Sequence, residues 1–169
     1  KPDDDSVPYK EGEWWYYSRV EAGKDYPIFA RKREVNGKEE VMLDGNDEAR
    51  RASYFNVCGT DVSFDGNTMV YGVDVQGRYQ CTLRVRNLIT GKDNAEVIVG
   101  SSGAVAWAAD HKTFFYIEND PVTLLTTTVK KHVTGTDPRT DKIVYEEKDP
   151  SFYLGLYVTS DNNYIVLAA

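Results

Sequence analysis

Short apolar segments alternate with turn residues along the whole chain, and no stretch shows the periodicity of a helix. The clearest segment is 79–88, where apolar residues alternate with polar or charged ones. Alternation with a period of two is typical of a strand that buries one face. The pattern predicts an all-β fold in which Leu83 and Val85 are buried while Arg84 and Arg86 face solvent or a sheet edge.

Three features recur in constant order about every 45–50 residues. The first is an aspartate turn followed by a β-rich apolar segment, at 62–71, 106–116 and 158–167. The second is a strand that ends in glycine, at 28–37, 83–91 and 128–135, and the third is a short apolar strand at 41–43, 97–99 and 143–145. Four short strands in a unit of this length are typical of one blade of a β-propeller.

The phase of the repeat predicts how the blades divide the chain. We expect a linker over 1–10, a partial blade over 13–45, complete blades over 54–100 and 103–146, and a half blade over 152–169. A propeller closes into a ring because closure hides its strand edges. The sequence therefore predicts a partial β-propeller made of four-stranded antiparallel blades, which is one piece of a larger ring. In isolation this piece would self-associate through exposed apolar blade faces.

Charge and hydropathy exclude several classes of partner. The 27 acidic and 20 basic residues give a net charge of −7, which argues against nucleic-acid binding. No apolar run approaches the roughly 20 residues that a membrane-spanning helix needs, and the first ten residues hold no apolar segment of a signal peptide. We expect a cytoplasmic protein, with the periplasm as the alternative.

The two cysteines are expected to be free thiols. Cys58 and Cys81 fall on the first and third strands of one predicted blade. Two strand spacings separate such residues by about 9–10 Å. A disulfide needs Cα atoms within about 7 Å, so the prediction is two unpaired thiols, which suits a reducing compartment.

No set of residues in the sequence predicts a catalytic, metal or cofactor site. Gly100-Ser101-Ser102-Gly103 lacks the G-x-S-x-G spacing of a nucleophile elbow and is interpreted as a tight turn between blades. His111 lies in a polar turn and His132 on an edge-like strand, and neither has a partner at a spacing typical of a Ser-His-Asp triad. Two histidines and two separated cysteines predict no metal ligand set.

Two acidic runs and the aromatic residues admit a functional and a structural interpretation. The run Asp3-Asp4-Asp5 lacks the spacing of a calcium loop and is expected to be a solvated terminus. Glu146-Glu147-Lys148-Asp149 could face a peptide path, although solvent is the expected environment of a blade-end loop. The aromatic residues could form a stacking platform, but packing between blades is favoured; they are Trp14, Trp15, Tyr16, Tyr17, Trp107, Phe114, Phe115 and Tyr116.

Several stretches resemble the propeller of oligopeptidase B (protease II), a branch of the prolyl oligopeptidase family. The resemblance runs collinearly along the chain and departs from the family pattern at 58–61 and 126–130. Among the stretches that carry it are Gly12-Glu13-Trp14-Trp15-Tyr16-Tyr17, Tyr79-Gln80-Cys81-Thr82-Leu83-Arg84-Val85, Trp107-Ala108-Ala109-Asp110 and Val144-Tyr145-Glu146-Glu147-Lys148-Asp149-Pro150.

The resemblance implies a two-domain serine peptidase. In that family a seven-bladed propeller covers an α/β-hydrolase domain with a Ser-His-Asp triad and restricts entry to short peptides. About three of the seven blades would lie in this chain. The oligopeptidase B branch cleaves after Arg or Lys. The catalytic residues of the family lie in the hydrolase domain, so none is carried onto this chain; the implied partners are peptide substrates and that domain. The alternatives are a non-enzymatic propeller that scaffolds protein interactions and, disfavoured by the repeat, a small β-barrel.

Overall fold

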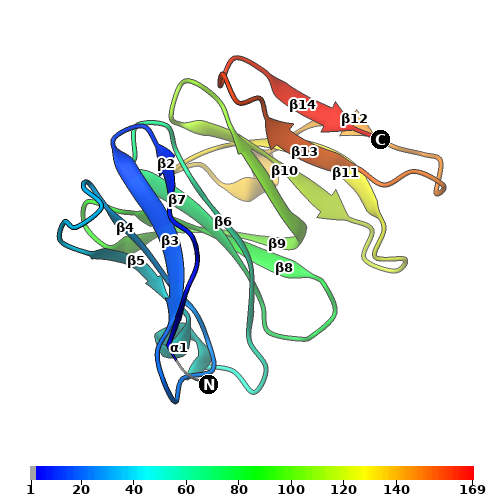
Figure 1. Cartoon of the computed structure of the whole chain (residues 1–169). Helices are drawn as coiled ribbons and strands as arrows, with labels where there is room; N and C mark the ends of the chain where they lie inside the picture. The colour runs from blue at the N-terminus through cyan, green and yellow to red at the C-terminus, as the bar shows by residue number, and fades with distance from the viewer. Residues whose placement is uncertain (1–2) are drawn as a thin grey trace. The chain divides into compact units, whose positions relative to one another are not determined.

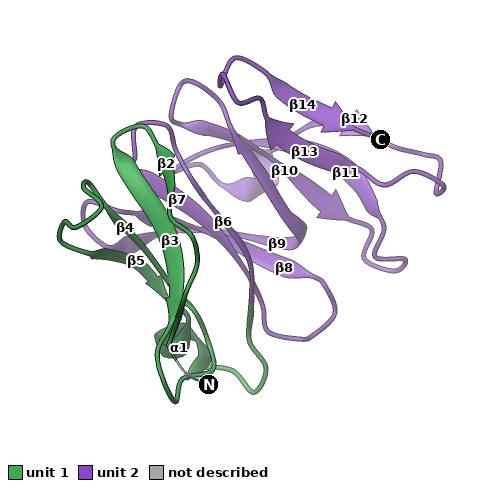
Figure 2. Ribbon diagram, viewed as in Figure 1, with its two compact units in different colours: residues 1–56 green, residues 57–169 purple. Residues whose placement is uncertain are grey.

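The computed structural model describes residues 3–169, and antiparallel strands dominate it (Figure 1). The chain forms two compact units, residues 1–56 and 57–169 (Figure 2). The all-β fold class is therefore confirmed.

The first unit is a small sheet centred on β3 (Trp14–Val20). β3 pairs with β4 (Ile28–Lys32), which pairs with β5 (Glu40–Asp44). Two short strands, β1 (Asp4–Asp5) and β2 (Tyr9–Glu11), pair with the other edge of β3. Part of the segment expected as a linker thus joins the sheet, while Lys1 and Pro2 lie outside the described residues.

The first unit also holds one turn of helix, α1 (Gly45–Ala49). The helix starts there because the Asp44 carboxylate accepts a hydrogen bond from the backbone N–H of Asn46.

The second unit is built on one sheet whose strands follow chain order. The strands are β6 (Asn56–Val62), β7 (Thr68–Asp74), β8 (Cys81–Asn87), β9 (Lys92–Trp107), β10 (Thr113–Asn119), β11 (Thr126–Val133) and β12 (Lys142–Glu146). A short 3₁₀ turn, η1 (Pro138–Thr140), precedes β12, and β13 (Gly155–Val158) pairs with β14 (Ile165–Ala168) in a separate ribbon.

The 16-residue strand β9 is shared by two groups of four strands, β6 to β9 and β9 to β12. It pairs with β8 over Lys92–Ser101 and with β10 over Ser101–Trp107. Residues 100–103 were expected to form a tight turn, and that expectation is wrong. The chain passes through them as a continuous strand, in which Gly100 and Gly103 adopt φ values of +75° and +93° that favour glycine.

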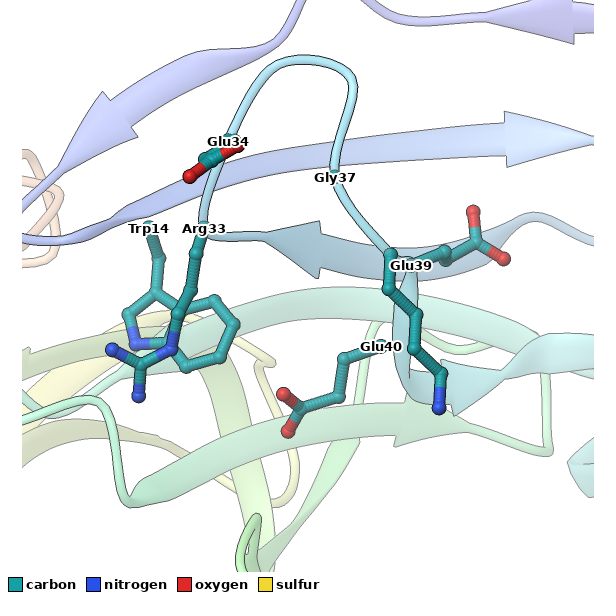
Figure 3. A pocket seen from close by; sticks show the side chains of 7 residues that line it. Trp14, Arg33, Glu34, Gly37, Glu39 and Glu40 are labelled. Atoms are coloured by element: carbon teal, nitrogen blue, oxygen red, sulfur yellow. The ribbon is translucent and has the colours of Figure 1, made fainter.

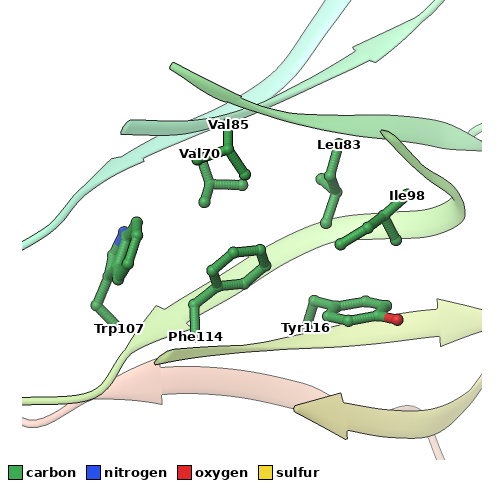
Figure 4. Close-up of a cluster of buried hydrophobic side chains, with 7 residues drawn as sticks. All are labelled: Val70, Leu83, Val85, Ile98, Trp107, Phe114 and Tyr116. Atoms are coloured by element: carbon green, nitrogen blue, oxygen red, sulfur yellow. The ribbon is translucent and has the colours of Figure 1, made fainter. Parts of the chain in front are cut away.

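The largest core cluster of the second unit comes from β7 to β10. Leu83, Val85 and Phe114 are among its members, all at most 1% exposed (Figure 4). Arg84 and Arg86, on the opposite face of β8, are only partly buried. The predicted alternation of β8 is therefore confirmed. A second cluster of Ile117, Val129 and Leu154 packs against Leu156 and Leu167 of the β13–β14 ribbon.

The expectation that the cysteines are free is wrong, because Cys58 and Cys81 form a disulfide. Their strands, β6 and β8, do flank β7 as predicted, but the two Cα atoms are only 6.3 Å apart. The middle strand carries Gly72 at this point, and a Cβ atom there would lie 3.3 Å from that of Cys58 and 3.5 Å from that of Cys81. The cysteines meet across β7 because Gly72 has no side chain and sheets twist. The argument from free thiols to a reducing compartment therefore no longer applies.

Within residues 3–169, no helix is both long and apolar enough to cross a membrane.

Candidate functional site

The serine that superficially resembles a nucleophile has a structural environment. Ser101 lies fully buried at the centre of β9, where its hydroxyl donates to the carbonyl oxygen of Ile117 (2.8 Å). The same hydroxyl oxygen accepts a hydrogen bond from the N–H of Gly103 (3.0 Å). These bonds fix the point where β9 passes from one group of strands to the next, so Ser101 has no free path to a substrate carbonyl.

His132 has partners that the sequence analysis did not find. Its ring is fully buried, with Nδ1 2.7 Å from Oδ1 of Asp141 and Nε2 3.8 Å from Oε1 of Glu96. The Tyr116 hydroxyl donates to the other Asp141 oxygen (2.9 Å), and Phe114 packs on the imidazole with centroids 5.0 Å apart. The expectation of an exposed or edge residue without a partner is therefore wrong for His132.

This cluster resembles the His–Asp half of a triad, but its burial points to a structural role. The side chains of Asp141 and Glu96 are only 2% and 4% exposed. Burial, the hydrogen bond to Asp141 and the negative charge of Asp141 all raise the pKa of Tyr116. The cluster connects β9, β10, β11 and the segment before β12, so we assign it to holding the outer strand in place.

His111 is partly buried in the second unit, whereas the first acidic run lies on the surface of the first unit. His111 occupies the turn after β9 with φ +59°, and its ring meets that of Phe64 edge-on. Asp3 accepts a hydrogen bond from the N–H of Ala22 (2.7 Å), and Asp4 and Asp5 form β1. The run thus pairs with β3 instead of fraying. Among residues 3–169, no group of three or more His, Cys, Asp or Glu side chains is placed to hold a metal ion.

The aromatic residues divide between core and surface. Trp107, Phe114 and Tyr116 are buried in the main cluster of the second unit, as the packing interpretation predicts. Trp14 is only partly buried, and its ring lies against two guanidinium groups, those of Arg31 (3.8 Å to the ring centroid) and Arg33 (4.6 Å). Cation–π contacts therefore occupy the ring that could have stacked on a ligand.

Trp14 and Arg33 line a cavity of about 560 Å³ in the first unit (Figure 3). Two of the carboxylates that line it form ion pairs: Glu40 with Arg31 (2.8 Å) and Glu39 with Arg19 (2.8 Å). The Arg19 guanidinium lowers the pKa of Glu39, while burial and the hydrogen bond to Glu39 raise the pKa of Tyr17 to about 12. Carboxylates that are held in ion pairs, as Glu39 and Glu40 are, are not free to act as a nucleophile or a general base.

The second acidic run lies where β12 ends. Glu147 accepts hydrogen bonds from the Tyr145 hydroxyl (2.8 Å) and from the N–H of Asp149 (2.9 Å), which fold the run back on itself. Glu146, Lys148 and Asp149 are exposed. The solvent-exposed interpretation therefore holds for the chain as described.

The hairpin that Gln76-Gly77 predicts between two strands connects β7 to β8. The buried Asp74 carboxylate accepts from the N–H groups of Gln76 (2.8 Å), Gly77 (2.9 Å) and Tyr79 (3.0 Å). A sequence signal was available, since Asp followed three residues later by Gly between two strands is typical of a turn closed by the aspartate side chain.

The fold and these contacts define the class of the protein: a propeller segment whose polar clusters connect strands of the same sheet. The family model described as "Prolyl oligopeptidase, N-terminal beta-propeller domain" matches residues 1–169. The chain belongs to this family, and with the sheets above the match establishes a partial β-propeller of antiparallel blades.

Named relatives are peptidases. The chain is 39% identical to "Dipeptidyl aminopeptidase BI" of Pseudoxanthomonas mexicana, over 99% of this chain and 25% of that protein. It is 29% identical to "Protease 2" of Moraxella lacunata, over 94% of this chain and 24% of that protein. The structure of oligopeptidase B from Leishmania major matches 98% of this chain and 24% of its own, with a TM-score of 0.91 and 28% identity. The chain thus spans about a quarter of the length of these relatives.

Proposed function

We propose that this propeller segment belongs to a serine peptidase of the oligopeptidase B type that cleaves short peptides after Arg or Lys. In this proposal the propeller covers the catalytic domain and admits only peptides that fit beneath it, so closure of the two domains completes the active site. One observation carries the proposal: the match to oligopeptidase B extends over 98% of the chain with a TM-score of 0.91.

A second candidate function follows from the 39% identity to a dipeptidyl aminopeptidase, which exceeds the 28–29% identity to oligopeptidase B and protease 2. The name of that relative describes release of dipeptides from the amino end of a peptide. Such an enzyme needs the free amino group of its substrate, whereas an endopeptidase does not.

Chromogenic dipeptides separate these activities when they are assayed with the full-length parent protein. We expect hydrolysis when Arg or Lys precedes the reporter group, a much lower kcat/KM when Pro takes that place, and loss of activity with a serine-directed inhibitor. Activity on amino-blocked substrates supports the endopeptidase, and activity confined to free amino termini supports the dipeptidyl aminopeptidase.

Two further measurements complete the test. Lengthening the substrate to a folded domain of about 100 residues should abolish cleavage if the propeller limits size. Residues 1–169 alone should be inactive, since the buried Ser101 and His132 form no nucleophile–base pair. A parent protein that hydrolyses none of these substrates contradicts the proposal and favours a non-enzymatic propeller.

A further inference from the structure

Strand β6, the first strand of the seven-stranded sheet, is covered far less than the strand beside it. None of the seven residues of β6 is buried, whereas six of the seven residues of β7 are. β6 is also an end strand of its sheet and pairs with β7 alone in the part of the chain that the structure describes. A strand with little buried surface has a low local stability, because few contacts oppose its opening.

A cavity of about 190 Å³ lies beside β6, so the strand is also incompletely packed against its neighbours. Gly59 of β6, Gly72 of β7 and Gly103 of β9 are among the residues that line the cavity. A Cβ atom at Gly59 would lie 3.6 Å from the carbonyl oxygen of Gly103, so β6 and β9 approach each other through residues without side chains. Atoms that face a void lose their van der Waals contacts, which lowers the stability of β6 further.

The second half of β6 is anchored without help from the cysteines. The strand leads into Ser63, which is 2% exposed and whose hydroxyl oxygen accepts a hydrogen bond from the N–H of Thr68 (3.1 Å). Two residues earlier, the carbonyl oxygen of Asp61 accepts a hydrogen bond from the indole N–H of the buried Trp107 (3.2 Å). These contacts hold residues 61–63 in the blade in either redox state of the cysteines.

The first half of β6 is held by the disulfide between Cys58 and Cys81. Cys81 is 3% exposed in β8, whereas Cys58 is only partly buried. β9 passes against the bond at Gly103, where a Cβ atom would lie 2.8 Å from Cβ of Cys58 and 3.4 Å from Sγ of Cys81. Glycines on β7 and β9, Gly72 and Gly103, thus leave room for the disulfide, and its loss leaves residues 56–59 with little to hold them.

We propose that the Cys58–Cys81 disulfide is a redox-sensitive crosslink, whose reduction by a dithiol releases residues 56–59 while the rest of the sheet stays folded. A thiolate of the dithiol attacks Sγ of Cys58, the more exposed cysteine, and the bond to Cys81 breaks with Cys81 leaving as a thiolate. The second thiol of the reductant then displaces Cys58 from the mixed disulfide. Two electrons and two protons thereby pass from the dithiol, which becomes a disulfide, to the two cysteines.

Release of this segment would change the inner wall of the propeller. Residues of β6, of the second half of β9 and of β13, the first strands of three successive repeats, line the same cavity. First strands that converge in this way are typical of blades arranged around a central channel. The inference rests here on the proposed function, in which the propeller limits the size of the peptides that reach the catalytic domain. With residues 56–59 released, the wall opens beside the channel and longer peptides are admitted.

Hydrogen exchange of the full-length parent, measured by mass spectrometry with and without dithiothreitol, tests the release directly. We expect the backbone amides of residues 56–59 to exchange at least ten-fold faster after reduction, while those of β10 change less than two-fold. The double variant Cys58→Ser with Cys81→Ser should exchange fast at 56–59 under both conditions, which assigns the effect to this disulfide and not to other cysteines of the parent. Equal acceleration in β6 and β10, or none in either, would overturn the proposal, and the unsubstituted protein gives this result even where the variant does not fold.

A short and a long peptide with the same cleavage site test the effect on access. We expect reduction to raise the ratio of kcat/KM for the long peptide to that for the short peptide at least five-fold in the unsubstituted parent. In the double variant the ratio should be high with and without dithiothreitol. A ratio that reduction does not change would overturn the role in access. A parent that cleaves neither peptide contradicts the proposed function instead, and hydrogen exchange at 56–59, which needs no substrate, still tests the crosslink.

Discussion

At the scale of single residues, Leu83 and Arg84 are neighbours on β8 with opposite environments. Leu83 is 1% exposed in the main core cluster, while Arg84 is on the other, partly exposed face. We expect Leu83→Ala to lower the free energy of unfolding by about 2–5 kcal/mol, since it removes buried apolar atoms and leaves a cavity. Arg84→Ala should cost under about 0.5 kcal/mol. Urea denaturation of both variants measures the difference, and equal losses would mean that β8 is shifted by one residue.

Asp141 provides a second test at this scale because it holds two buried partners, His132 and Tyr116. Asp141→Asn replaces one carboxylate oxygen by a donor, so either the imidazole or the tyrosine hydroxyl loses its acceptor. Leaving a buried polar group without a partner costs about 1–3 kcal/mol, and we expect a loss of unfolding free energy in that range.

Asp137→Asn is the matched control for Asp141→Asn. Asp137 lies four residues earlier in the same connection but is exposed, and its ion pair is with the exposed Arg139. We expect no measurable change, because an asparagine oxygen can still accept the N–H of Arg139. Similar losses in the two variants would show that the connection, and not the buried cluster, determines stability.

The sequence predicted single-residue environments only where they follow a local pattern. Alternation along β8 identifies Leu83 and Val85 as buried without any knowledge of distant contacts. His132 has no such pattern, because Asp141 follows in an irregular connection and Glu96 comes from β9, a strand that the intervening β10 separates from β11. Asp141 and Glu96 come close to His132 only when the sheet is assembled.

At the scale of elements, the disulfide joins β6 to β8 across β7. The two cysteines are 23 residues apart in sequence. The loop that the disulfide closes restricts the unfolded chain and is expected to stabilise the fold by about 2–4 kcal/mol. We therefore expect the double substitution Cys58→Ser with Cys81→Ser to lower the free energy of unfolding by that amount. Thiol titration of the unsubstituted protein under denaturing, non-reducing conditions should find no free thiol, and two thiols per chain would contradict the bridge.

The ion pair between Arg86 and Asp93 joins β8 to β9 and makes that pairing sensitive to acid. Burial raises the pKa of Asp93, but hydrogen bonds from Arg86 and Tyr71 and the positive charge of Arg86 outweigh burial, so the pKa of Asp93 is lowered. A lowered folded-state pKa stabilises the fold above the unfolded value of about 3.9, and this contribution is lost as the pH falls through the folded-state pKa.

We accordingly expect Asp93→Asn to destabilise the protein at pH 7 and to have less effect at pH 2–3. Urea midpoints at the two pH values give the comparison, since the variant removes one titrating group and leaves the other carboxylates unchanged. A penalty that is the same at both pH values would show that hydrogen-bond geometry, and not the charge of Asp93, stabilises this strand pair.

Strand positions could be predicted from the sequence, whereas distances across strands could not. Apolar runs and glycine turns placed β7, β8 and β10 close to where they lie. The predicted 9–10 Å between Cys58 and Cys81 assumed a flat sheet with side chains on every strand. Neither assumption holds, because the sheet is twisted and Gly72 on the middle strand has no side chain. Neither effect is a property of the cysteines themselves.

At the scale of the whole molecule, the order of the repeat predicted the fold class, because each repeat is one supersecondary unit that cannot bury its apolar face alone. The contacts of the turns in the second unit could not be predicted in this way. The turns are distant in sequence, and the left-handed backbone of Tyr79 is shared by His111, Leu124 and Asn162 in other turns. The Asp74 contact of Tyr79 is local to the hairpin, whereas the hydrogen bond from the Asn119 side chain to the carbonyl oxygen of Tyr79 depends on tertiary structure.

Residues 1–169 on their own end in a ribbon of two strands. The β13–β14 ribbon is a two-stranded sheet with Tyr157 and Tyr164 exposed, and two strands alone are marginally stable. Unpaired strand edges recruit further strands. We expect the isolated chain to self-associate as its concentration rises, seen as increasing mass by light scattering across a dilution series. Tyr157→Lys should weaken the association because a lysine beside a strand edge opposes pairing, whereas Ile89→Lys, in a turn remote from that edge, should not. A monomer that unfolds cooperatively at every concentration would show that the ribbon is stable without a neighbour.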